Sequence, residues 1–178
     1  MTALDQQANL LGALALVISD QTAHAAAAAA GQSVSAAAAL SALHHFLDHP
    51  TLDQLHKVLG LTPSGAVRLV DRLADAGLVT RGTGGNGRSR SVILTDAGER
   101  AARQITAARA TLLSNVLGEL SPAERETLHS LMGRIMASVV RGKEGGAWIC
   151  RLCDLEACGR ASGHCPVASA AAAKYASP

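Results

Sequence analysis

The first thirty residues carry the strongest structural signal in the chain. Residues 4–30 are rich in Ala and Leu, and the run from Ala25 to Ala30 repeats the residue of highest helix propensity. The pattern predicts one long helix that ends at Gly31, since glycine commonly follows the last helical residue. Because alanine side chains let helices approach closely, other helices are expected to pack against it.

The remaining composition also favours helices over sheets. Hydrophobic residues make up 48% of the 178 positions, yet the chain has one Trp, one Tyr and one Phe. A sheet sandwich needs larger side chains in its core, whereas Ala, Leu and Val suit close-packed helices. The length permits either an ordinary single globular protein or a compact protein divided in two. We therefore expect a mainly α fold with little strand.

Capping and turn residues divide the next stretch of the chain into short helices. A second helix is expected between residues 33 and 50, because Pro50 disfavours helical geometry in the residue before it. A short third helix is expected over residues 51–60, where a capping box precedes an apolar run. A fourth is expected over residues 62–77, capped by Thr62 and followed at once by Pro63.

A hairpin and two long helices follow. Residues 78–81 and 90–94 are strand candidates, and the Gly-rich residues 82–89 between them predict a β-hairpin. Further capping signals predict helices over residues 96–120 and from 121 to about 141.

The order helix, tight turn, helix and hairpin is that of a winged helix-turn-helix. From Lys57 to Arg90 the chain has six basic residues and two acidic ones, a net charge of +4. Such a surface attracts a polyanion such as DNA, although a solvated charged face explains the charge alone equally well.

In this arrangement the fourth helix enters the major groove. Arg68 then reaches base edges or phosphates, Ser64 and the amides of the helix N-terminus hold phosphate, and Arg88 and Arg90 reach the minor groove from the wing. The predicted DNA-binding residues are Thr62, Ser64, Gly65, Arg68, Arg72, Arg88 and Arg90. The predicted apolar side of the helix consists of Val67, Leu69, Val70 and Leu73.

These segments resemble the MarR family of bacterial transcriptional regulators over about residues 33–140. The matching stretches are residues 52–55, 62–73, 76–79 and 88–98. The resemblance implies an obligate homodimer whose first and last two helices interlock, with one winged domain of each protomer on a pseudo-palindromic DNA operator. Asn86-Gly87 stands where the family usually has Asp-Arg, which leaves more of the wing contact to Arg88. No catalytic constellation is found, so an enzyme is not expected.

All four cysteines fall within sixteen residues, as Cys150, Cys153, Cys158 and Cys165 in the spacing C-x2-C-x4-C-x6-C. Thiols this close can fold around one centre at a small loop-closure cost. Disulfides are disfavoured in a reducing cytosol, which leaves metal ligation or redox chemistry as the interpretation. The four cysteines are therefore the predicted metal ligands.

The spacing favours an iron–sulfur cluster, [2Fe-2S] or [4Fe-4S], and Cys165-Pro166 is a pairing also seen at ferredoxin ligands. The layout is similar to MerR-family redox regulators, which hold a [2Fe-2S] cluster in a C-terminal four-cysteine loop. Zinc and a metal-free thiol switch stay as alternatives. Four thiolates around Zn²⁺ or either cluster sum to a charge of −2, which Arg151 and Arg160 could offset. Four histidines near residue 50 (His44, His45, His49 and His56) are interpreted as exposed or capping residues.

The expected organisation has four segments. Residues 1–46 and 96–142 supply the dimerisation helices, residues 47–95 form the winged helix-turn-helix domain, and residues 143–178 form the metal-binding extension and tail. The apolar stretch 10–18 lacks the basic flank of a signal peptide and is too short to span a bilayer, so a cytoplasmic protein without membrane contact is expected.

The function expected is that of a dimeric DNA-binding repressor that senses redox state, oxygen, nitric oxide or iron through an iron–sulfur cluster. One alternative is a zinc-stabilised regulator that responds to a small anionic ligand in the dimer cleft. Another is an electron-transfer or scaffold protein without sequence-specific DNA binding.

Overall fold

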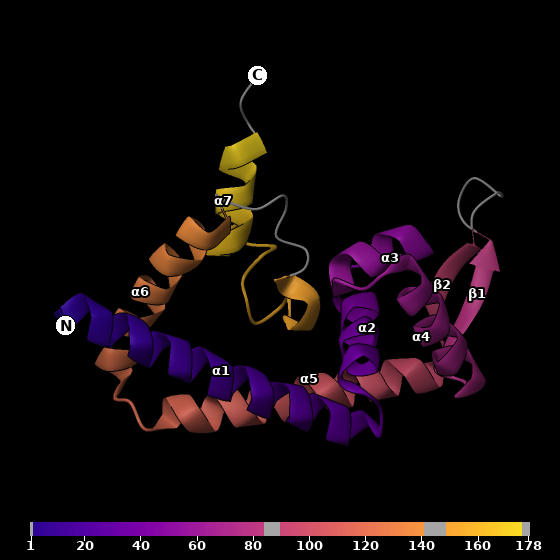
Figure 1. The fold of residues 1–178 in the computed structure, drawn as a ribbon, viewed down its shortest axis with the longest axis horizontal. Helices are drawn as coiled ribbons and strands as arrows, with labels where there is room; N and C mark the ends of the chain where they lie inside the picture. The colour runs from indigo at the N-terminus through magenta and orange to yellow at the C-terminus, as the bar shows by residue number, and fades with distance from the viewer. Residues whose placement is uncertain (1, 84–89, 141–148, 176–178) are drawn as a thin grey trace.

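A computed structural model describes residues 2–83, 90–140 and 149–175, and it is mainly α-helical, as expected (Figure 1). In chain order the elements are α1 (Ala3–Ala30), α2 (Val34–His45), α3 (Leu52–Leu59), α4 (Pro63–Asp75), β1 (Val79–Thr83), β2 (Arg90–Leu94), α5 (Asp96–Gly118), α6 (Pro122–Val140), the short 3-10 helix η1 (Cys150–Leu152) and α7 (Pro166–Tyr175).

The long first helix is confirmed, and it ends at Gly31 as predicted. Thr2 and Asp5 form a capping box, in which each side chain accepts a hydrogen bond from the other residue's backbone amide. At the other end Gly31 adopts the left-handed conformation, with φ of 58°, and its amide donates back to the last turn of the helix.

Helix α2 is the centre of the core. Every residue from position 36 to 43 is buried, and its small side chains let α1, α5 and β2 pack closely around it. Leu55 of α3, Leu69 and Leu73 of α4, and Ile105 of α5 complete the same apolar cluster. The helix ends at His45, earlier than the expected boundary near Pro50.

The hairpin joins the winged region to α5. Strands β1 and β2 pair antiparallel from Val79 opposite Leu94 to Thr83 opposite Arg90. The hydroxyl of Thr95 donates to the Gly77 carbonyl at 2.7 Å. Gly98 lies so close to the strand that an added Cβ would come within 2.0 Å of the Leu78 carbonyl oxygen. The base of the wing is therefore fastened to the first turn of α5.

In Figure 1 the winged region (α2, α3, α4 and the hairpin) stands at one end of α5, and α6 and α7 stand at the other end. Helix α1 packs along α5, and α7 packs against α6. The Ala-rich residues 166–175 form the short helix α7.

Most of the exposed large apolar side chains lie on α1 and α6. On α1 they are Leu4, Leu10, Leu11, Leu14, Leu16 and Val17, and on α6 they are Leu131, Met132, Ile135 and Val139. We call these residues the α1–α6 apolar surface. Such a surface in a single protomer indicates an area that another molecule covers.

The length of α1 corrects one premise of the sequence analysis. The stretch 10–18 is not a short apolar segment but belongs to a 28-residue helix, which by length and composition could cross a membrane. Core helices of soluble proteins meet the same criterion, and the C-terminal half of α1 buries Thr22 and Ala26 inside the fold.

Candidate nucleic-acid interface and cysteine site

Helix α4 presents one polar face to solvent. Thr62 caps the helix by accepting a hydrogen bond from the Gly65 amide at 3.1 Å, and Pro63 occupies the first helical position. Ala66, Leu69, Val70 and Leu73 are the buried residues of the helix. Ser64, Arg68 and Arg72 lie on its exposed side. The predicted site residues of α4 therefore share a single surface.

The prediction for Val67 was wrong. Its side chain is 40% exposed and lies on the same face as its neighbour Arg68, whereas the smaller Ala66 takes the buried position. Val67 thus joins the exposed face as an apolar group, of the kind that contacts the methyl group of thymine in a major groove.

An ion pair holds the wing against α4. The Arg81 guanidinium of β1 donates to the Asp71 carboxylate of α4. The two charges offset each other, so Arg68 and Arg72 carry the exposed positive charge of the helix. Of the predicted wing residues, Arg88 lies outside the described residues, and the backbone of Arg90 pairs with Thr83 at the end of the strand ladder.

A model of the MarR family matches residues 30–89. This span holds α2, α3, α4 and the first strand of the hairpin, the elements that form the winged region. Over these residues the chain is similar to the MarR family. The fold expected for a MarR-family protein, a winged helix-turn-helix with additional helices, is the fold described above.

Several solved structures share the fold. RV1404 of Mycobacterium tuberculosis is 25% identical, with a TM-score of 0.65 over 78% of this chain and 95% of that one. The multiple antibiotic-resistance repressor of Listeria monocytogenes is 23% identical, with a TM-score of 0.56 over 78% of this chain and 97% of that one. A mutant of MepR of Staphylococcus aureus, bound to an oligodeoxyribonucleotide, is 17% identical, with a TM-score of 0.56 over 75% and 97%.

The four cysteines come together near the C-terminal end of the described chain. Cys150 and Cys165 are buried, and Cys153 and Cys158 pack against them. The same small cluster contains Phe46 from the end of α2, Met136 and Ala137 from α6, and Val167 and Ala170 from α7. The cysteine segment, residues 150–165, thus connects α6, the last long helix, to the end of α2 in the winged region.

The thiols differ in acidity because they interact with one another. Hydrogen bonding with Cys153 and burial raise the pKa of Cys150. The same hydrogen bond, together with the nearby guanidinium groups of Arg109 and Arg160, lowers the pKa of Cys153 to about 6. Burial raises the pKa of Cys158. Cys153 is therefore more ready than Cys150 or Cys158 to act as a thiolate.

The donor chemistry of this cluster fits a thiolate-ligated metal group. All four cysteines are free thiols, and they share one apolar cluster. The Nε of Arg109, a cation whose charge reaches Cys153, is buried and finds no hydrogen-bond partner within the described ranges 2–83, 90–140 and 149–175. Among the described residues, however, no three His, Cys, Asp or Glu side chains are arranged to hold a metal ion. Ligation would therefore require the sulfurs to draw closer together.

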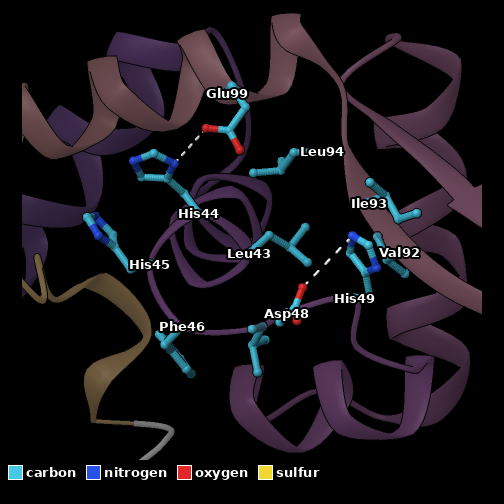
Figure 2. Close-up of a pocket in the computed structure, with 11 residues that line it drawn as sticks. Leu43, His44, His45, Phe46, Asp48, His49, Val92, Ile93, Leu94 and Glu99 are labelled. Atoms are coloured by element: carbon cyan, nitrogen blue, oxygen red, sulfur yellow. Dashed lines mark hydrogen bonds and ion pairs between the residues drawn. The ribbon is translucent and has the colours of Figure 1, made fainter. Parts of the chain in front are cut away.

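Two histidines contribute to the structure in a way that the sequence did not reveal. His44 Nδ1 lies 2.7 Å from the Glu99 carboxylate, and His45 Nε2 lies 2.9 Å from the Thr106 hydroxyl. Figure 2 shows His44 turned toward Glu99 at the edge of a pocket of about 320 Å³ between the end of α2, β2 and α5. Burial lowers the pKa of His45, and His44 lowers it further.

The interpretation of these two side chains as exposed or capping groups was therefore wrong. Each is half-buried and fastens α2 to α5. Their partners lie 55 and 61 residues further along the chain, so no local pattern identifies them. His49 is exposed, as expected, while His56 contacts the Leu61 carbonyl and Asp53 at 3.2 Å each.

Proposed function

We propose that this chain is a dimeric, sequence-specific DNA-binding repressor of the cytoplasm whose DNA affinity depends on a metal group held by its four cysteines. The observation that carries the DNA-binding role is the exposed face of α4. There Arg68 and Val67 stand on a helix that is capped at Thr62, braced by Asp71 and packed on the core through its other side. A rigid helix with such a face suits readout of a major groove.

Each residue of this face has a role in the proposed complex. Arg68 donates to base edges, Val67 contacts a thymine methyl group, and Arg72 contacts phosphate further along the helix. Ser64 and the amides of the first turn, near Gly65, hold a phosphate at the positive end of the helix dipole. Thr62 acts through the cap, since its hydroxyl is already an acceptor for the Gly65 amide. Arg88 and Arg90 contact the minor groove from the wing.

The α1–α6 apolar surface supports the dimer. Its side chains lie exposed on helices at the end of the protomer remote from the hairpin (Figure 1). Burying them against a second copy would remove a large apolar area from water. A two-fold dimer would also present two α4 helices to a pseudo-palindromic operator, with half-sites about 34–36 Å apart.

Cys150, Cys153, Cys158 and Cys165 would hold the metal group, for which an iron–sulfur cluster is our first assignment and zinc the second. A bound cluster would supply electron exchange and reactivity toward oxygen or nitric oxide. The chain's own residues bury the site: Phe46 and Met136 cover it from α2 and α6, and Val167 covers it from α7. A change in the positions of the thiols would therefore alter the packing at the ends of both α2 and α6.

Anaerobic reconstitution with iron and sulfide, followed by operator titration of the loaded and metal-free dimers, tests this function. We expect a visible chromophore, four cysteines protected from alkylation, and a difference in operator affinity between the two states. A colourless protein that retains zinc would show that the metal group is zinc and not an iron–sulfur cluster. Equal affinities in both states would show that the metal has only a structural role. DNA binding without sequence preference would contradict the proposed role as a sequence-specific regulator.

A further inference from the structure

Arg109 occupies an unusual position for an arginine. It lies in the middle of α5, where it is half-buried, and its Nε has no hydrogen-bond partner among the residues that the structure describes. Burying a portion of a guanidinium without an acceptor costs free energy, because the group gives up water and gains nothing in return. An arginine in such a place indicates an anionic partner that the polypeptide alone does not supply.

The surrounding contacts show where that partner lies. Arg109 is one helical turn beyond Ile105, which belongs to the central core. Leu152, the residue before Cys153, packs against the same core. The η1 turn also contacts α2. In Figure 2 the ribbon of the cysteine segment runs past the end of α2, where His45 and Phe46 are labelled. Arg109 therefore lies where α5, the end of α2 and the cysteine segment meet.

The charges of the segment supply the anion. Four thiolates around Zn²⁺, [2Fe-2S]²⁺ or [4Fe-4S]²⁺ leave a net charge of −2, and Asp154 and Glu156 in the same turn add to it. Arg160 belongs to the segment itself and is exposed, so water screens much of its effect. A cation that is partly buried is screened less and stabilises the charged site more strongly.

We propose that Arg109 is a positioning residue of the cysteine site, where its guanidinium offsets the charge of the thiolate-ligated group and ties the segment to α5. This inference rests on the proposed function, because a segment of neutral thiols would carry no such charge. The proposed contact would link the metal group directly to α5, the helix that follows the wing. The proposed partner of Arg109 is a metal centre with four thiolate ligands and a net negative charge. Arg109 does not specify which metal this centre contains.

Anaerobic titration of the metal-free dimer with Co²⁺ tests the role of Arg109, because thiolate-to-cobalt absorption reports ligation whichever metal is native. Arg109→Gln removes the charge, Arg109→Lys keeps it, and Arg100→Gln removes an equal charge from an exposed position of the same helix. We expect Gln at 109 to weaken Co²⁺ binding about 10- to 100-fold, the range typical of outer-sphere partners. Lys at 109 should recover most of this loss, and the Arg100 variant should match the parent.

Each other outcome has a distinct meaning. A parent protein without thiolate-to-cobalt absorption would refute the proposed metal site and Arg109's role with it. A parent that binds Co²⁺ no more tightly than a folded Arg109→Gln variant would refute the role of Arg109 alone. Failure of Lys to rescue would show that Arg109 fills space rather than supplying charge. Should the Gln variant not fold by circular dichroism, Arg109→Met, which keeps the apolar stem, takes its place with the same expectation.

Discussion

Arg68 is the residue on which the proposed DNA readout depends most. We expect Arg68→Ala to weaken operator binding by about 1–3 kcal/mol and to relax the preference at one base position in each half-site, because a bidentate base contact is lost. Arg134→Ala removes an equal charge from the exposed side of α6 and should leave operator binding nearly unchanged. Titrations in which both variants behave alike would show that α4 does not read the groove.

Gly98 is a second residue with a clear structural demand. Its Cα faces the Leu78 carbonyl so closely that Gly98→Ala requires the wing and α5 to separate. We expect this change to lower the free energy of unfolding by at least about 1–3 kcal/mol, as other overpacking substitutions do. Gly118→Ala, in the last turn of the same helix with open space around it, should be neutral or slightly stabilising. Thermal unfolding of both variants decides, and equal stabilities would contradict the close packing.

At the scale of elements, α1 combines two surfaces with different tasks. Its C-terminal half belongs to the protomer's own fold, while its N-terminal half leaves Leu10 and Leu14 exposed. We expect Leu10→Glu with Leu14→Glu to raise the dimer dissociation constant at least about tenfold, since a buried carboxylate is costly in an apolar interface. Sedimentation measures the change. Ala173→Glu on the exposed side of α7 serves as the control, and double-variant dimers of parental stability would place the interface elsewhere.

The elements also show which features of the fold are readable in the sequence. Helix limits were predictable where capping residues act locally, as at Thr62, Thr95 and Gly31. The early end of α2 was not, because it depends on how Phe46 and the two histidines before it pack against distant segments. In the same way, the apolar spacing of the sequence predicts Val67 on the buried side of α4. In the packed structure Ala66 is buried instead and Val67 is exposed.

For the candidate site the limit is one of distance along the chain. The cysteines could be grouped from their spacing alone because they are near neighbours in sequence. Arg109 could not be added to them, since it lies 44 residues before Cys153 and only the folded chain brings its charge within reach of that thiol. Residues on α4 were predictable from the motif, whereas their exposure required the packed structure.

For the whole molecule, the cysteine segment should couple metal binding to DNA binding. We expect Cys158→Ser to destabilise the metal group and to change operator affinity by the same amount as removing the metal from the parent, about 1–3 kcal/mol. Ser162→Ala, in the same turn but on an exposed residue, should have no comparable effect. Operator titrations under anaerobic conditions measure both. A cysteine variant that loses the metal and binds DNA like the loaded parent would separate the two functions.

Helix α5 has the geometry of a lever that is held near its middle. Its 23 residues extend about 35 Å, and the His45 contact at Thr106 lies about 15 Å from the end that carries the wing. A tilt of about 10° around that pivot would displace the wing end by about 2.6 Å, close to the spacing of one base pair along DNA. A displacement of this size would shift the register between the two half-sites of an operator.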